Sequence, residues 1–584
     1  MSKRKKKNRG QRLTPEQKAQ RREQRTFRRN IYSVFDTADF NSVKTKGKNI
    51  TFLGRTSEFD SIFIHENIVI IAEDTCHDSS SRIRDHLLKK DSFYEHVRKN
   101  KNAFIDFLET EFPDFKDKKK DDYSADDITL LTVYCSKYRM EDEHKKPFDK
   151  IIFFENRHVE YFNALTKTLG KTVRFELFKF LGLKAKDIGL KAGFKRGSYD
   201  GFILPESPSG FPSGFKVVTF YIDPATLMEL SYVLRKDGWM DGDGLYQRMI
   251  SRSKIRGMRH YLSQDQRVFI NNAIVSLPSS TKILTADGKR ELSLSEITKT
   301  TSVKVDIPIE FDTIGIIDGQ HRVFAYHEGH DTHDAAIAPK RKKQQLLVTG
   351  VVYPTAISED KQREFEAGLF LEINDKQTKT RADLRQAIEA IVNPYSVLAI
   401  SKAVINRLAA TGPLCGLLEE HQFDRGKLKS SSIVSYGLKH VVKCEGDDTL
   451  FKLWKHPDKE ALAAAIQSAT KGKKKFSTPA KAVLNDYTDY CAKEINKVLA
   501  GFRSSLPPGF WTLDRKKSMA VTTTAINGVI QCVRLLVEKE KTATFEGYQK
   551  AFKNMSIDFS KSGFKYKSSH WGDLGGKIFN QCFN

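Results

Sequence analysis

The sequence predicts a multidomain protein of mixed α/β and α+β class whose C-terminal region is mainly α-helical. Its 584 residues are too many for a single hydrophobic core, so roughly two to four domains are expected. Strand-like apolar runs alternate with helical patterns as far as about residue 380, and beyond residue 382 apolar residues recur at spacings of three and four. These patterns predict two domains built from strands and helices, followed by a helical region.

Positive charge is concentrated at the N-terminal end. Lys and Arg outnumber Asp and Glu by 98 to 73, which gives a net charge of +25. Thirteen of these cations lie in residues 1–30, against two glutamates. A polyanion is the expected partner, and DNA is favoured over a membrane because no lipid-directed apolar face accompanies the charge.

Residues 1–30 are predicted to form a basic, partly disordered arm. The block that contains Lys5, Lys6 and Lys7 repels itself, and these three lysines are predicted phosphate contacts. Thr14 and Pro15 predict the start of a helix that runs to about Arg29. Few of its residues are apolar, so packing against the rest of the chain is not expected. A merely solubilising tail is the alternative.

The cysteines and the hydropathy predict a cytoplasmic protein. Seven scattered cysteines form no CxxC pair, which favours neither a disulfide framework nor a zinc site. No run of eighteen apolar residues occurs, so no membrane span is expected.

Residues 31–162 contain a predicted β-hairpin with acidic groups at its open end. Two strand patterns between Glu58 and Thr75 are joined at residues 65–67. In an antiparallel hairpin the start of the first strand lies beside the end of the second, so Asp60 and Glu73 are expected to meet. Two converging carboxylates suit Mg²⁺, the usual metal of phosphodiester hydrolysis. Solvated carboxylates at the end of an ordinary hairpin are the alternative.

The spacing of Glu58, Asp60 and Glu73 resembles the acidic motif of PD-(D/E)XK nucleases. The resemblance implies a restriction-endonuclease-like α/β domain with Asp60 and Glu73 as metal ligands and Glu58 as an auxiliary carboxylate. The family's lysine is expected two positions after Glu73, where this chain has Thr75. Some members supply that lysine from the next helix, which makes Lys89 the candidate here, and a decayed, inactive site stays open as the alternative.

A turn-rich connector over 163–214 leads into a second domain, predicted over 215–390. A strand over 216–222 is followed by a basic amphipathic helix or helix pair, and Arg248, Arg256 and Arg259 of this region are predicted DNA contacts. The strand Ile314–Ile317 then runs into Asp318 and Gly319, and a helix begins just beyond.

The turn after this strand is a predicted phosphate-binding turn. The N-terminus of a helix favours an anion, and Gln320, His321 and Arg322 place polar and cationic groups beside it. A helix cap with Arg322 paired to a nearby carboxylate is equally compatible with the spacing.

The string Asp318-Gly-Gln-His-Arg322 resembles the signature of DGQHR-domain proteins, a branch of the ParB/sulfiredoxin superfamily. The basic helix before it and the segment Phe370–Gln377, with Asn374 and Gln377, are similar to the same family. The chain also resembles the regulator found with DNA-phosphorothioation genes, which shares the DGQHR signature. The resemblance implies a ParB-like α+β domain and a nucleoside triphosphate as ligand. It also implies a bacterial DNA-modification or phage-defence setting, with operon proteins or further copies of the chain as partners.

Residues 391–584 are predicted to be helical, with C-terminal aromatic residues that pack in a core rather than stack on bases. The chain as a whole is expected to act on DNA, with the nuclease-like domain coupled to a DNA- or nucleotide-sensing domain. The alternative is a DNA-binding regulator or assembly factor without catalysis.

Overall fold

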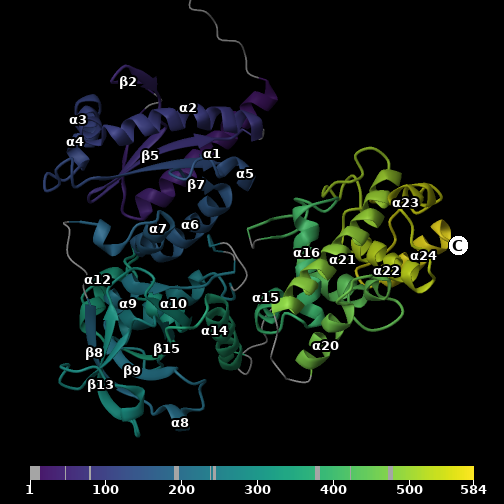
Figure 1. Cartoon of the computed structure of the whole chain (residues 1–584). Coiled ribbons are helices and arrows are strands. Elements are labelled where there is room, and N and C mark those ends of the chain that lie inside the picture. Colours follow the sequence, from purple (N-terminus) through teal and green to yellow (C-terminus); the bar gives the residue numbers. More distant parts are fainter. Residues whose placement is uncertain are drawn as a thin grey trace, which may run out of the picture. The chain divides into compact units, whose positions relative to one another are not determined.

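The computed structural model describes residues 14–45, 48–77, 80–189, 196–236, 238–240, 245–374, 382–420, 423–470 and 478–584 (Figure 1). It confirms the mixed α/β class and the helical C-terminal region. The chain divides into two compact units, one formed by residues 1–233 and 249–356 and the other by residues 234–248 and 357–584. Lys5, Lys6, Lys7 and Gln377, which are predicted contacts, lie outside the described residues.

The first unit begins with a long helix that packs on a sheet. Helix α1 (Pro15–Thr37) starts as predicted, because Thr14 accepts a hydrogen bond from the Gln17 backbone N–H and Pro15 occupies the first turn. The prediction of an unpacked arm that ends near residue 29 is wrong. The helix continues for two more turns and buries a row of apolar residues, namely Phe27, Ile31, Val34 and Phe35.

The first sheet has five strands in the order β1 (Asn41–Val43), β4 (Ser61–His65), β5 (Ile68–Thr75), β6 (Thr129–Ser136) and β7 (Ile152–Glu155). Strands β1, β4 and β5 are antiparallel neighbours, whereas β5, β6 and β7 run parallel. A small separate hairpin joins β2 (Ile50–Phe52) to β3 (Arg55–Ser57). The predicted hairpin over residues 58–75 is therefore the β4–β5 pair.

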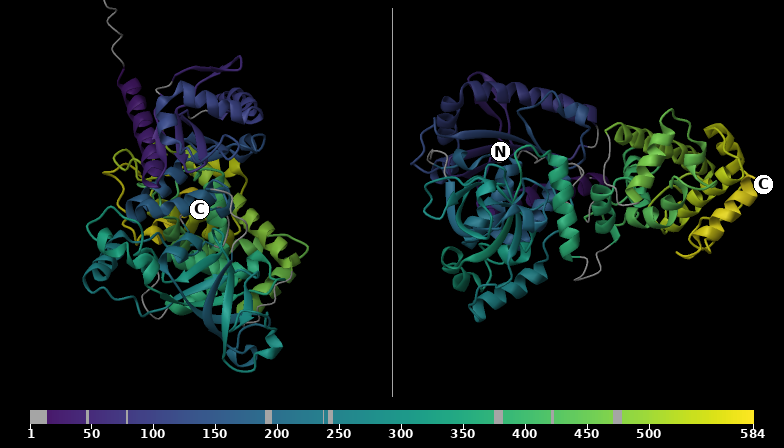
Figure 2. Two further views of the ribbon diagram at one scale, coloured as in Figure 1. Left: turned by 90° about the vertical axis from the view of Figure 1, so that its left-hand side faces the viewer. Right: turned by 60° about the horizontal axis from the view of Figure 1, so that its bottom comes forward.

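Helices cover this sheet on both faces (Figure 2). Helices α2 (Ser80–Lys99), α3 (Lys101–Glu111) and α4 (Pro113–Lys118) share one apolar cluster with Val69 and Ile71 of β5. On the other face α1 packs on β4, where the rings of Phe35 and Phe63 stack at 4.3 Å, beside α6 (Asn156–Leu169). Neighbouring residues of β5 thus face different helices.

The region predicted as a connector is more structured than expected. Helix α6 extends to Leu169, α7 (Arg174–Phe180) follows, and β8 (Arg196–Ile203) belongs to the second sheet. Arg174 binds both carboxylate oxygens of Glu328, at 2.8 and 3.1 Å, which ties α7 to the domain that follows.

The second sheet has eight strands in the order β10 (Ser231–Tyr232), β14 (Ile314–Asp318), β11 (Ala273–Leu277), β15 (Leu346–Val352), β9 (Lys216–Ile222), β8, β13 (Thr301–Pro308) and β12 (Lys282–Thr285). The pairs β10–β14 and β11–β15 are parallel and the others antiparallel. The helices between its strands include α9 (Pro224–Leu230), α10 (Arg252–Gln264), α12 (Asp334–Ile337) and α13 (Lys340–Lys343). Strand β14 lies between β10 and β11, and the turn at Gly319 follows its last residue.

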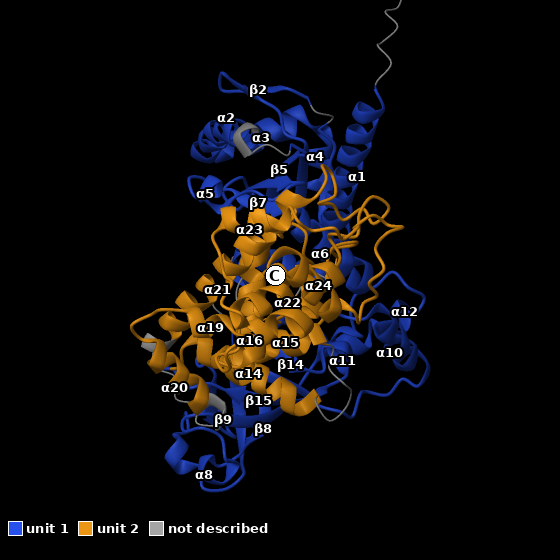
Figure 3. Cartoon of the chain, turned by 90° about the vertical axis from the view of Figure 1, so that its right-hand side faces the viewer, with its two compact units in different colours: residues 1–233, 249–356 blue, residues 234–248, 357–584 orange. Residues whose placement is uncertain are grey.

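The second unit is helical (Figure 3). Its longer helices are α14 (Glu359–Asn374), α15 (Ala382–Val392), α16 (Val397–Ala410), α20 (Lys459–Thr470), α21 (Thr478–Ser505), α22 (Thr523–Glu538), α23 (Phe545–Phe552) and α24 (Trp571–Cys582). They enclose one apolar core, in which Phe552, Phe559 and Phe579 are buried as predicted. Among the described residues no single helix is long and apolar enough to cross a membrane, although α15 and α16, bent by 104°, pass such a test as a pair.

Candidate active site at the ends of β4 and β5

The open end of the β4–β5 hairpin brings three carboxylates together. Ser61 pairs with Ala72, and the Asp60 N–H donates to the Ala72 carbonyl at 3.1 Å. The Asp60 carboxylate accepts a hydrogen bond from the Asp74 N–H at 3.0 Å. The register of the hairpin therefore places Asp60 beside the acidic end of β5, where Glu73 and Asp74 lie.

Glu73 and Asp74 point to opposite faces, because side chains alternate along a strand. On the α1 face, Arg28 donates from Nε to Asp74 at 2.6 Å and from Nη2 to Asp60 at 2.5 Å. Asp74 is buried, and its other oxygen has no hydrogen-bond partner. Arg28 thus bridges Asp60, just before β4, and Asp74, near the end of β5.

On the α2 face, Glu73 is held by a lysine and approached by a histidine. The Lys90 ammonium lies 2.9 Å from one Glu73 oxygen and also donates to the Glu58 carbonyl at 2.5 Å. Nε2 of His86 lies 3.5 Å from the other Glu73 oxygen, and its Nδ1 lies 3.0 Å from the Tyr134 hydroxyl. The side chain of Glu58 is exposed, so this residue contributes its backbone to the arrangement.

Lys90, rather than its neighbour Lys89, pairs with Glu73. The predicted lysine, Lys89, is exposed on α2, whereas the Lys90 side chain is buried against Glu73. A catalytic role for Lys89 stays a prediction. The buried row of α2 is made by Ile83, Leu87, Lys90, Tyr94 and Val97. Lys90 fits the three-and-four spacing of that row and Lys89 does not, which is the signal that selects between them.

Burial dominates the electrostatics of the carboxylates. Burial raises the pKa of Glu73 to about 8, and the charges of Asp60 and Glu58 act in the same direction against the Lys90 ammonium. Burial also raises the pKa of Asp74 to about 6, against the opposing effect of Arg28. For His86, burial and the neighbouring Lys90 lower the pKa to about 4, so the ring is neutral near pH 7.

The donor set fits Mg²⁺ in kind. This ion is usually held by one or two carboxylates, with water and phosphate oxygens in the remaining positions. Asp60 and Glu73 supply two carboxylates, each now paired with a cation. In the described part of the chain no three His, Cys, Asp or Glu side chains form a group that could hold a metal by itself. Any Mg²⁺ at Asp60 and Glu73 would therefore depend on water and phosphate ligands.

The raised pKa of Glu73 predicts a stability that falls with rising pH. Folded Glu73 keeps its proton up to about pH 8, whereas the unfolded residue has lost it above pH 5 or so. The free energy of unfolding should therefore decrease between about pH 6.5 and 8, by at most about 1.4 kcal/mol per pH unit for one linked proton. Chemical denaturation of the intact protein across this window measures the slope.

Glu73→Gln is the matched variant, since it cannot titrate. Its unfolding free energy should vary less with pH than that of the unchanged protein, and equal slopes would contradict the assignment. Below pH 6.5 Asp74 and His86 also contribute to the pH dependence of the unfolding free energy. The raised pKa of Asp74 and the lowered pKa of His86 change stability in opposite directions, so the measurement is restricted to higher pH.

The turn after β14 adopts the strand, glycine and helix order that was predicted. Gly319 has a φ of 96°, which favours glycine, and begins the short helix α11 (Gln320–Phe324). Nη2 of Arg322 donates to Asp318 at 2.9 Å and to the Asn272 carbonyl at 2.8 Å. The alternative in which Arg322 pairs with a nearby carboxylate is thus the arrangement observed. Binding of a nucleoside triphosphate at this turn stays a prediction.

The remaining residues of the predicted phosphate turn have local partners. His321 Nε2 accepts a hydrogen bond from the Ser251 N–H at 3.0 Å, and Gln320 is buried. Asn374 ends α14 in the second unit and donates to the Phe370 carbonyl of its own helix at 2.8 Å.

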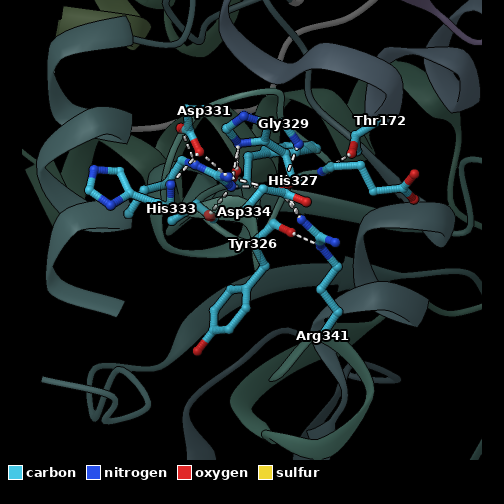
Figure 4. Close-up of polar contacts among 12 residues, drawn as sticks. Thr172, Tyr326, His327, Gly329, Asp331, His333, Asp334 and Arg341 are labelled. Atoms are coloured by element: carbon cyan, nitrogen blue, oxygen red, sulfur yellow. Dashed lines mark hydrogen bonds and ion pairs between the residues drawn. The ribbon is translucent and has the colours of Figure 1, made fainter. Parts of the chain in front are cut away.

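Arg259 is a buried structural residue, and the prediction of a DNA contact is wrong. Only 1% of its side chain is exposed, and it donates to Asp331, Asp334 and the carbonyls of Ala325 and His327 at 2.7 to 3.0 Å. Figure 4 shows this cluster, in which Arg341 also points to Asp334. The guanidinium has no surface left for a phosphate.

Arg256 and Arg248 are exposed, so both stay predicted contacts. Arg256 lies three residues before Arg259 on α10. Residues three apart lie close together around a helix, so Arg256 stands at the edge of the buried side, in solvent, whereas Arg259 lies within the buried cluster.

Four residues of the hairpin site escape the sequence motif, namely Arg28, Asp74, His86 and Lys90. The apolar spacing of α1 could have indicated Arg28, and that of α2 could have indicated His86 and Lys90, since each lies beside buried apolar positions. No protein-family model, curated protein or solved structure matches the chain.

Proposed function

We propose that the first sheet and its helices form a Mg²⁺-dependent nuclease domain that acts on DNA. The proposal depends on the register of the β4–β5 hairpin, which brings Asp60 beside the end of β5, and on the pairing of Lys90 with Glu73 at that same end. In this assignment Asp60 and Glu73 hold the metal, and the bound ion supplies charge neutralisation at the phosphate and activation of water. Lys90 stabilises the negative charge that develops on the phosphoryl oxygens.

The order of elements supports the assignment. Helix α1, the antiparallel strands β1, β4 and β5, the crossover helices and the parallel strand β6 are similar in arrangement to the core of PD-(D/E)XK nucleases. Lys90 reaches Glu73 from the helix that follows β5, so a lysine is present although Thr75 occupies the expected position.

The proton on Glu73 bears on metal binding. Carboxylate ligands must be ionised, so metal binding competes with protonation. Since the pKa of Glu73 is raised to about 8, the apparent affinity for Mg²⁺ increases as the pH approaches that value. The pKa of Asp74 is lower, at about 6, and this residue faces Arg28 instead.

The domain around Asp318–Arg322 is proposed to sense DNA or a nucleotide and to regulate cleavage. The contacts of Arg174 and Lys171 with Glu328 support a mechanical connection, because they join α7 and its neighbourhood to the segment just after α11. The resemblance to DGQHR-domain proteins supports a proposed setting in DNA modification or phage defence, with operon proteins or a second copy of the chain as proposed partners.

A DNA-binding regulator without catalysis is the second candidate. Two observations favour it: Thr75 replaces the expected lysine, and Arg28 already occupies an oxygen of Asp60. In that case DNA binds and no phosphodiester bond is broken.

Incubation of the intact protein with plasmid and linear DNA in Mg²⁺, with and without chelator, tests the proposal. Cleavage is expected with Mg²⁺ only, and Asp60→Asn and Glu73→Gln should abolish it. Asp121→Asn, an exposed loop carboxylate of the same domain, is the matched control and should leave the rate unchanged. Absence of cleavage by the unchanged protein together with DNA binding supports the regulator, and cleavage that persists in both site variants overturns the assignment of the site.

A further inference from the structure

The exposed side of helix α1 carries a row of five cations, which we call the α1 basic row. Its members are Lys18, Arg21, Arg22, Arg25 and Arg29. All five side chains are exposed, and within the described part of the chain no carboxylate forms an ion pair with any of them. The one glutamate among them, Glu23, accepts a hydrogen bond from the Tyr138 hydroxyl at 3.3 Å.

The spacing of the row places it on one side of the helix. Arg21 and Arg22 are adjacent, and each member lies three or four residues from another, which is the helical repeat. The buried residues Phe27, Ile31 and Val34 lie on the opposite side and fix the helix to the sheet. The row is therefore a rigid surface on a docked helix, and it extends for about 16 Å along the helix axis.

This arrangement is unfavourable for the isolated protein. Like charges four residues apart, such as Lys18 and Arg22 or Arg25 and Arg29, destabilise a helix by about 0.2 to 0.5 kcal/mol a pair. Cations near a helix N-terminus also oppose the helix dipole. A bound polyanion removes both penalties, so the row is suited to a ligand with closely spaced negative charges.

The same helix carries Arg28 into the hairpin site. Arg28 contacts Asp60 and Asp74, while Arg25 and Arg29, its neighbours in the row, are exposed to solvent. The first turns of α1 project beyond the sheet in two views (Figures 2 and 3). A strand of phosphates that follows the row thus arrives at the end of the helix from which Arg28 reaches Asp60.

We propose that the α1 basic row binds the phosphate backbone of double-stranded DNA and guides one phosphate toward Asp60 at the end of the β4–β5 hairpin. The guiding role rests on the proposed nuclease function, whereas DNA binding by the row stands without it. A duplex fits better than a flexible single strand because both the row and the duplex backbone are stiff and straight over this length.

A charge-neutral variant tests the row. Glutamine keeps the helix propensity, so the five residues are replaced as Lys18→Gln, Arg21→Gln, Arg22→Gln, Arg25→Gln and Arg29→Gln. The matched control removes five exposed lysines of the C-terminal region, as Lys550→Gln, Lys553→Gln, Lys561→Gln, Lys565→Gln and Lys567→Gln. Both proteins lose the same charge, and circular dichroism checks that both remain folded.

Binding of a fluorescent duplex is measured in chelator, where no cleavage occurs, between about 50 and 200 mM salt. Each lost phosphate contact reduces the slope of log K against log salt by about 0.9, so the row variant should lose up to about 4.5 of slope. The C-terminal control should retain the slope of the unchanged protein. Equal slopes in the row variant and the unchanged protein overturn the proposal, as does an equal loss in the control.

Two further comparisons separate the proposals. A single strand of equal length, or vesicles of anionic lipid, that displaces the duplex at equal phosphate concentration overturns the assignment to double-stranded DNA. Asp60→Asn should bind the duplex at least as tightly as the unchanged protein. If the unchanged protein binds the duplex with the expected dependence on salt but does not cleave it, the nuclease proposal alone fails. If the row variant has the same salt dependence as the unchanged protein, the proposal for the row alone fails.

Discussion

Replacement of Lys90 by methionine should slow Mg²⁺-dependent DNA cleavage by about a hundredfold to a thousandfold. A preorganised cation or hydrogen-bond donor beside the developing charge contributes an effect of this size in other enzymes. Lys90 is buried and lies 2.9 Å from Glu73, and methionine retains most of its volume without the charge. Single-turnover cleavage at saturating DNA measures the chemical step.

Lys89→Met is the matched control for this experiment. Lys89 is adjacent in sequence but exposed on α2, so its replacement should change the rate less than about twofold. DNA binding in chelator should be the same in both variants, because the buried Lys90 is not expected to reach the phosphate backbone before chemistry begins. A large loss in Lys89→Met with little loss in Lys90→Met would contradict the role given to Lys90.

Arg259→Ala should lower the free energy of unfolding of the first unit by about 3 to 5 kcal/mol. Removal of one partner of a buried ion pair leaves the remaining charges without compensation, and losses of this size follow. Arg259 also holds the carbonyls of Ala325 and His327, so the segment after α11 loses hydrogen bonds as well. Urea denaturation followed by circular dichroism and by limited proteolysis measures the change.

Arg256→Ala, on the exposed side of α10, should change the free energy of unfolding by less than about 0.5 kcal/mol. For DNA binding the expectation is reversed: Arg256→Ala should weaken it and Arg259→Ala should not, since only Arg256 is accessible to a phosphate. An Arg259→Ala protein with unchanged stability and weaker DNA binding would restore the interpretation that the structure now contradicts.

Local sequence signals were sufficient for the backbone of both candidate regions. Thr14 and Pro15 fixed the start of α1, the two apolar runs before Thr75 fixed the β4–β5 hairpin, and Gly319 fixed the turn after β14. Each of these depends on residues close together in the chain, where capping, alternation and glycine conformation act.

The partners of the charged side chains could not be predicted from local sequence signals. The distances from Arg28 to Asp60 and from Arg259 to Asp331 in the sequence are 32 and 72 residues, so their contacts depend on how the elements pack. Net charge made Arg259 look like a DNA contact, although burial decides its role. For Lys90 the packing face of α2 was readable from its apolar spacing, whereas the family resemblance indicates only that the next helix can supply the lysine.

The packing of α1 limits how the protein can be shortened or tagged. A fragment that begins at residue 31 would lose Phe27 from the interior and Arg28 from Asp60 and Asp74, and its exposed hydrophobic surface would favour aggregation. A fragment that begins at residue 14 keeps the helix cap and every buried residue of α1. Loss of function after removal of residues 1–30 would thus report damage to the folded domain as readily as loss of a DNA-binding tail.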